Sequence, residues 1–191
     1  MTSPSFERLP GIEIGNGNHR IRLDLFFDLQ CPYSKKSWDV IGESVSNEWK
    51  DRIGIYFQPI CLSHHRQSWD LTRALLAIKN IDESRTLEFI NHVYSNQEKF
   101  YNADWKSKGQ DEFLNDLARF SQKIADRSAK DFINSIESDD NYSRSKQSIH
   151  YAAVKQVWST PTFLFNDVPV ADLDSSSSLE DWNGFFSGLD F

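Results

Sequence analysis

The sequence predicts an α/β fold in which β regions at both ends of the chain flank a block of helices. Residues 21–29 alternate and then run apolar, which is typical of a central, buried strand. Residues 53–57 repeat that pattern after a helix-length segment, and strand, helix and strand together predict a βαβ unit with parallel strands. Between residues 68 and 158 no strand pattern occurs, and strands resume only after it.

The first residues predict an arm followed by a short strand. Residues 1–10 read as an N-terminal arm, and residues 12–14 alternate between apolar and polar side chains. The Asn-Gly pair at residues 16–17 is a turn signal between strands. We therefore expect the strand at residues 12–14 to lie beside the central strand, with a plain loop as the alternative.

A helix begins close to Cys31. The strand pattern stops at Gln30, and Pro32 is well tolerated in the first turn of a helix. The first-turn N–H groups and the positive end of the helix dipole favour an anion there, so they favour a thiolate at Cys31. Lys35 and Lys36 add positive charge if they turn that way. The alternative is that Cys31 is a small buried apolar residue, which is the usual fate of a free cysteine.

The helix after Cys31 carries one apolar face and ends near Lys50. The face is formed at spacings of three and four by Trp38, Ile41, Val45 and Trp49. In a parallel βαβ unit both strands end at the same edge of the sheet. Cys31 follows the first strand, and Cys61, His64 and His65 follow the second, so we expect these side chains to emerge together.

His64 and His65 have two functional interpretations. They supply a base or a charge near Cys31, or they form a metal site with the two cysteines, because imidazole and thiolate are zinc ligands. The spacing matches no recognised zinc pattern, and adjacent histidines tend to point apart, so we predict no metal site. Solvated or helix-capping histidines are the default interpretation. Cys61 is expected to be buried at the strand end.

The pattern of apolar residues in 67–155 predicts an all-helical insertion. Apolar residues recur at helical spacing in the segments 69–78, 87–94, 113–124, 132–136 and 142–157. Ser128 and Asp131 resemble a capping box at the start of the fourth segment.

The sequence after residue 158 predicts a β-hairpin and a final helix. A strand opens at Pro161, a turn falls at residues 166–167, and Pro169 marks the short return strand as an edge. Ser178 and Asp181 fit a capping box, so a final helix is expected to start there.

Composition narrows the class of protein. The chain has 191 residues, enough for one core with an inserted subdomain, and its 2 Cys exclude a disulfide scaffold. The net charge of −7 opposes binding to phosphates, so we expect no nucleic-acid partner. Neither a run of about 18 apolar residues nor an apolar leader segment occurs, so we expect a cytoplasmic protein without a membrane partner.

Two motifs, in order, carry a family resemblance. Residues 31–34, Cys-Pro-Tyr-Ser, end a buried strand, and residues 159–163, Ser-Thr-Pro-Thr-Phe, open a late strand after the helical block. The chain thereby resembles the DsbA-like branch of the thioredoxin superfamily. The resemblance implies a thioredoxin-like fold, with a mixed sheet flanked by helices and an inserted all-helical subdomain. It implies a discontinuous thioredoxin-like domain made of residues 11–66 and 156–191. Residues 67–155 would form the helical insertion.

The resemblance also implies residue roles. Cys31 would be the nucleophile and Ser34 a hydrogen-bond donor to its thiolate. Substrate binding would fall to Pro32, Tyr33, Thr160 and Pro161. In the family the proline at position 161 is cis and lies beside the active-site sulfur, and the backbone of the preceding residue pairs with a substrate chain. An ordinary trans proline at the start of a strand is the alternative.

Ser34 departs from the family pattern, because disulfide oxidants and isomerases of this family generally carry a second cysteine there. A mixed disulfide at Cys31 then needs another resolving thiol. Glutathione could supply it as a co-substrate, without any bound cofactor, or Cys61 could. We therefore predict a thiol-disulfide oxidoreductase, monothiol and glutathione-linked, acting on a thiol- or disulfide-containing protein or small molecule.

Two other functions stay open. The site also resembles the Ser-Pro-Tyr-Ser region of kappa-class glutathione transferases and hydroxychromene carboxylate isomerases, which activate the sulfur of glutathione itself. A non-catalytic redox-sensing or binding module is the third interpretation, because a fold does not guarantee a function.

Overall fold

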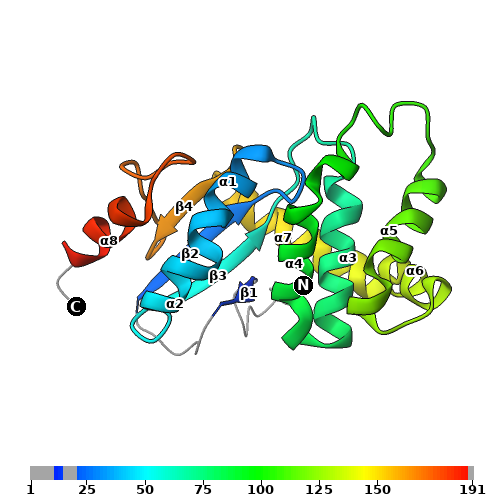
Figure 1. Cartoon of the computed structure of the whole chain (residues 1–191), viewed down its shortest axis with the longest axis horizontal. Coiled ribbons are helices and arrows are strands. Elements are labelled where there is room, and N and C mark those ends of the chain that lie inside the picture. The colour runs from blue at the N-terminus through cyan, green and yellow to red at the C-terminus, as the bar shows by residue number, and fades with distance from the viewer. Residues whose placement is uncertain (1–10, 15–20, 189–191) are drawn as a thin grey trace, which may run out of the picture.

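The computed structural model describes residues 11–14 and 21–188, and these form one mixed sheet flanked by helices (Figure 1). The sheet has five strands in the order β1-β3-β2-β4-β5. Their bounds are β1 Ile12–Glu13, β2 Arg22–Phe27, β3 Gly54–Pro59, β4 Thr162–Phe165 and β5 Val168–Pro169. β2 lies at the centre, parallel to β3 and antiparallel to β4. The predicted α/β class and the parallel βαβ unit are confirmed.

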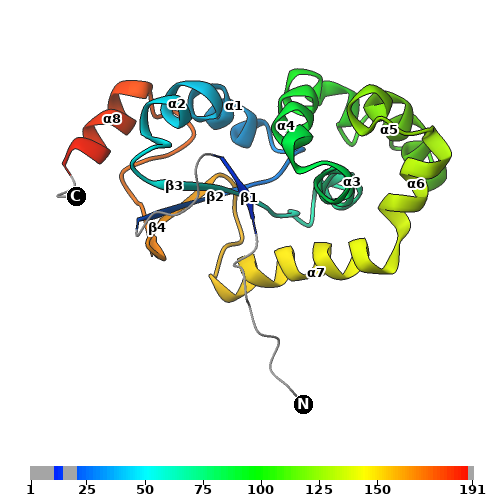
Figure 2. The same cartoon turned by 90° about the horizontal axis from the view of Figure 1, so that it is seen from below.

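Helices cover both faces of the sheet and form a separate block beside it. Their bounds are α1 Pro32–Val40, α2 Ser46–Trp49, α3 Ser68–Ile81, α4 Thr86–Ser95, α5 Gln110–Ala125, α6 Ala129–Glu137, α7 Asp139–Val154 and α8 Leu179–Ser187. Figure 2 shows α1, α2 and α8 on one face of the sheet, α7 running across the other, and α3 to α6 to one side. None of the helices in the described part of the chain is long and apolar enough to cross a membrane.

The helix after Cys31 buries the predicted face. Trp38, Ile41, Val45 and Trp49 are all buried. The helix is not uniform, because a π-helical turn, Ile41–Val45, separates α1 from α2. Gly42 lies in this turn against the indole of Trp38, and a Cβ there would come within 2.7 Å of the ring. The close approach of Trp38 therefore requires glycine at this position.

The prediction that the first strand lies beside the central one is wrong. β1 pairs antiparallel with β3, with Ile12 opposite Phe57. The reason is that both edges of β2 are already occupied, by β3 on one side and β4 on the other. The free edge of β3 is the place left for β1. The predicted turn at residues 16–17 and the predicted arm at 1–10 lie outside the described residues.

The block between β3 and β4 is helical, as predicted, and no strand occurs in the described chain between these two strands. α7 begins at Asp139 instead of residue 142, because the Ser138 side chain accepts a hydrogen bond from the Asn141 amide and caps the helix there. It ends at Val154, and Gln156 then takes a left-handed conformation with φ of 58°.

α7 connects the helical block to the sheet. Near its start, the side chain of Asn141 donates to the carbonyl of Arg73 in α3 at 2.9 Å. Near its end, Ser148 Oγ donates to the carbonyl of Pro59 at 3.0 Å, and Tyr151 stacks on Phe26 at a centroid distance of 5.8 Å. The division of the chain into domains at residues 66–67 and 155–156 stays a prediction.

The hairpin and the closing helix form as predicted. Asn166 and Asp167 both have positive φ, 47° and 69°, as a tight hairpin turn between β4 and β5 requires. β5, with Pro169, is one of the two edge strands of the sheet. Ser178 and Asp181 form the capping box that starts α8.

Candidate active site at the end of the central strand

Cys31 lies at the helix start that the sequence predicts. It is the N-cap residue of α1, with Pro32 in the first turn. Its amide donates to the carbonyl of Asp28 at 3.0 Å, and its carbonyl accepts from the amide of Lys35 at 3.1 Å. Only 3% of Cys31 is exposed, so little of its surface is open to solvent.

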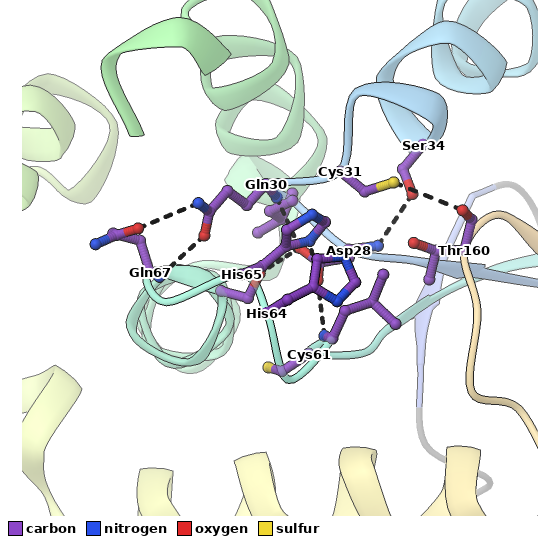
Figure 3. A network of polar contacts seen from close by, with 12 residues as sticks. Asp28, Gln30, Cys31, Ser34, Cys61, His64, His65, Gln67 and Thr160 are labelled. Atoms are coloured by element: carbon purple, nitrogen blue, oxygen red, sulfur yellow. Dashed lines mark hydrogen bonds and ion pairs between the residues drawn. The ribbon is translucent and has the colours of Figure 1, made fainter. Parts of the chain in front are cut away.

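The two sequence motifs meet at the sulfur of Cys31. Its Sγ donates to the carbonyl oxygen of Thr160 at 3.5 Å, a contact between residues 129 positions apart (Figure 3). The peptide bond between Thr160 and Pro161 is cis. The loop before β4 is therefore positioned directly against the candidate nucleophile. A substrate-binding role of the Thr160 backbone stays a prediction.

The other residues of the first motif divide between surface and core. Pro32 is exposed and Tyr33 is 62% exposed, whereas Ser34 is fully buried. Ser34 Oγ accepts a hydrogen bond from the amide of Asp28 at 3.2 Å. Ser34 also interacts with the buried hydroxyl of Tyr94, whose pKa burial raises well above its usual value. A donor role of Ser34 toward the Cys31 thiolate stays a prediction.

Asp28 is the site residue that the sequence reasoning missed. Its carboxylate is fully buried. Oδ1 accepts from the amide of Gln30 at 2.7 Å and from the hydroxyl of Ser68. Oδ2 accepts from the amide of Leu62 at 2.8 Å and from His65 Nδ1 at 2.9 Å. A buried carboxylate needs such donors, so an aspartate inside an apolar strand end is the signal that could have revealed it.

The two histidines lie together and do not point apart. Their ring centroids are 4.3 Å from each other, with the His65 ring held by Asp28 and His64 exposed. The prediction of divergent rings is wrong, because a reverse turn in which the His65 amide donates to the carbonyl of Leu62 folds the pair back on itself. In the described part of the chain, no three side chains of the metal-ligating types are grouped closely enough to hold a metal ion.

Cys61 lies at the same edge of the sheet as a free, half-buried cysteine. Its Sγ is 3.4 Å from Thr72 Oγ1. Burial raises the pKa of the Cys61 thiol to about 12, and the negative charges of Asp28 and Asp70 add to the rise. Cys61 is therefore a protonated thiol at neutral pH and a weak nucleophile. Its role as a resolving thiol stays a prediction.

The helical block holds the loop that carries Cys31. Gln97 is buried, and its side-chain Nε2 donates to the carbonyls of Leu29 and Cys31 at 2.9 and 3.0 Å. Tyr101 Oη donates in turn to Gln97 Oε1 at 3.3 Å. The carbonyls on both sides of Gln30 are thus fixed by one side chain from outside the sheet.

A second amide cluster joins the same loop to the start of α3. Gln30 Nε2 donates to Gln67 Oε1 at 3.1 Å and to Asn102 Oδ1 at 2.8 Å. The backbone amide of Gln67 donates back to Gln30 Oε1 at 2.9 Å (Figure 3). With each amide oriented by its partners, the strand end, the loop after β3 and the helical block form one hydrogen-bonded unit.

Comparisons with known proteins agree with this architecture. A family model described as Thioredoxin matches residues 8–185. The thiol-disulfide exchange protein α-DsbA2 from Wolbachia pipientis has a TM-score of 0.68 at 19% identity, over 93% of this chain and 84% of that one. DsbA from Chlamydia trachomatis has a TM-score of 0.71 at 16% identity, over 98% and 95%. Oxidised BdbD from Bacillus subtilis has a TM-score of 0.73 at 13% identity, over 93% and 91%.

The search of curated proteins finds no match. At identities below 20% these solved structures show a shared fold. The family match covers nearly the whole chain, and the chain belongs to the thioredoxin family.

Proposed function

We propose that this protein is a thiol-disulfide oxidoreductase of DsbA-like type that uses Cys31 as its single nucleophile. The observation that carries the proposal is the contact between Cys31 Sγ, at the start of α1, and the carbonyl of Thr160. A helix start stabilises the thiolate that exchange chemistry needs. The similar structures from Wolbachia and Chlamydia, described as a thiol-disulfide exchange protein and as DsbA, support this reaction class.

The reaction has two exchange steps, with glutathione as co-substrate. The Cys31 thiolate attacks the glutathione sulfur of a glutathionylated protein or small molecule, forms a disulfide with glutathione and releases the substrate as a thiolate. A second glutathione, as its thiolate, then attacks the bound glutathione sulfur. Oxidised glutathione leaves, and Cys31 is again a thiolate. Overall, the mixed disulfide of the substrate and one glutathione from solution become the substrate thiol and oxidised glutathione, one half of which is the glutathione that the substrate carried.

Ser34 favours this external cycle over an internal one. A dithiol enzyme resolves its mixed disulfide with a second cysteine of the motif, and Ser34 fills that position here. The pKa of Cys61, near 12, keeps the other cysteine protonated at neutral pH. We place the reaction in the cytoplasm, where glutathione is available as a reductant.

The test is reduction of a glutathionylated peptide, with oxidised glutathione measured as the product. We expect wild-type protein and Cys61→Ser to be active and Cys31→Ser to be inactive. Mass spectrometry of wild-type protein treated with oxidised glutathione should show one glutathione on Cys31. Activity that survives Cys31→Ser would refute the proposal and direct attention to a glutathione transferase.

A further inference from the structure

A monothiol cycle has a proton-transfer problem that the structure can address. The resolving thiol comes from solution, and a thiol with an ordinary pKa of about 8.5 is only about 3% ionised at pH 7. Because the thiolate is the nucleophile, a base beside Cys31 could raise the rate of the second step by up to about 30-fold. Such a base has to come from the titratable residues near the motif.

Asp28 forms hydrogen bonds with both Cys31 and His65. Its backbone carbonyl accepts from the Cys31 amide at 3.0 Å, and its backbone amide donates to Ser34 Oγ at 3.2 Å. Its side chain accepts from His65 Nδ1 at 2.9 Å. Asp28 is thus in contact with both Cys31 and His65, and Figure 3 shows the three residues.

The contact with Asp28 sets the chemistry of His65. A buried carboxylate acts as an acceptor, so the ring hydrogen is on Nδ1 and the lone pair of a neutral imidazole is on Nε2. The side chain of His65 is 14% exposed, so part of it is open to solvent. An imidazole oriented in this way accepts a proton at Nε2, and the carboxylate stabilises the resulting imidazolium.

The other titratable groups around His65 are less suited to accept a proton. The carboxylate oxygens of Asp28 are buried and already accept four hydrogen bonds. Burial raises the pKa of Cys61, on the same loop, to about 12, and Asp70 of α3 adds to that rise. His64 is exposed, and its ring packs against His65.

We propose that His65, oriented by Asp28, is the proton acceptor for the incoming thiol in the second exchange step. The thiol transfers its proton to Nε2, and the thiolate attacks the glutathione sulfur bonded to Cys31. That disulfide breaks, Cys31 leaves as a thiolate, and the imidazolium returns its proton to solvent. This inference rests on the proposed function. In it, His65 contacts the substrate and Asp28 is a positioning residue.

The test uses His65→Asn, because the asparagine amide can still donate to Asp28 while it cannot act as a base. His64→Asn is the matched control. Each protein is first converted to the Cys31–glutathione disulfide, and release of glutathione is then timed with two thiols. One is 2-mercaptoethanol, which is mostly protonated at pH 7, and the other is 2-nitro-5-thiobenzoate, which is already ionised.

We expect His65→Asn to slow release by 2-mercaptoethanol about tenfold at pH 7 and to change release by 2-nitro-5-thiobenzoate less than twofold. The loss should disappear at pH 10, where both thiols are ionised, and His64→Asn should behave as wild type. An equal loss with both thiols at every pH, or no loss at all, would overturn the inference.

The proposed function is tested before the inference in the same experiment. If wild-type protein forms no glutathione disulfide at Cys31, the monothiol cycle itself fails, and the role of His65 fails with it. If the disulfide forms and glutathione release is insensitive to His65→Asn, only the inference is refuted.

Discussion

At the scale of single residues, the two cysteines differ because their surroundings differ. Cys31 is an N-cap residue, whereas burial raises the pKa of Cys61 from 9.0 to about 12, which lowers its thiolate fraction at neutral pH about 10³-fold. We predict that iodoacetamide at pH 7.5 alkylates Cys31 much faster than Cys61, measured by mass spectrometry of the two peptides. In urea-unfolded protein the two rates should converge. Fast labelling of Cys61 in the folded protein would contradict the prediction.

Ser34 has a structural role that is separable from any catalytic one. Ser34→Ala removes the acceptor of the buried Asp28 amide, and an unsatisfied buried donor costs about 1–3 kcal/mol. We predict that urea unfolding shows a loss of stability in this range. Ser143→Ala, at an exposed position in α7, is the control and should change stability by less than about 0.5 kcal/mol.

At the scale of elements, the capping box of α8 gives a sharp prediction. Ser178→Ala removes the side chain that accepts from the Asp181 amide, which should cost about 1 kcal/mol in the free energy of unfolding. Ser178→Thr keeps a hydroxyl that accepts from the Asp181 amide and donates to its carboxylate, and should retain most of that stability. Equal losses in the two variants, measured by urea unfolding, would show that the cap does not stabilise the helix.

The elements also show what sequence patterns can predict. β2, β3 and the helix between them were predictable, because alternating and helical periodicities are local properties of the chain. The partner of β1 was not, because strand pairing depends on which sheet edges remain free. The start of α7 was missed for a different reason, since its cap at Ser138 precedes the first apolar residues of the helix.

Some residues of the candidate site could be identified from the sequence, and others could not. The motif residues Cys31, Thr160 and Pro161 were identified from a resemblance, and the common sheet edge followed from parallel topology. Asp28 was not identified, because its importance comes from donors that lie 34 and more positions away in the sequence. Long-range hydrogen bonds of this kind leave no periodic signal.

At the scale of the whole molecule, stability should decline at alkaline pH. Burial raises the pKa of Cys61 from 9.0 to about 12 and that of Tyr151 from 10.0 to about 12, with the Asp24 charge adding to the latter. The unfolded chain therefore loses these protons at lower pH than the folded protein does. The contribution is intact below pH 9 and is lost as the pH approaches 12, at up to about 1.4 kcal/mol per pH unit for each group.

Urea unfolding at pH 8, 9.5 and 11 measures this decline. Tyr151→Phe keeps the stacking on Phe26 and removes the titrating hydroxyl, so its stability should fall less steeply above pH 10. An unchanged slope in this variant would mean that Tyr151 does not contribute to the alkaline transition.

The hydrogen bonds from Gln97 to the carbonyls of Leu29 and Cys31 limit how far this protein can be made smaller. A shortened chain that joins residue 66 directly to residue 156 would keep all five strands, α1 and α8. It would also expose two carbonyls beside the nucleophile to water and leave the loop free to change shape. The inserted helices are thus part of the smallest unit that holds the Cys31 loop in its observed conformation, although none of the motif residues is located in them.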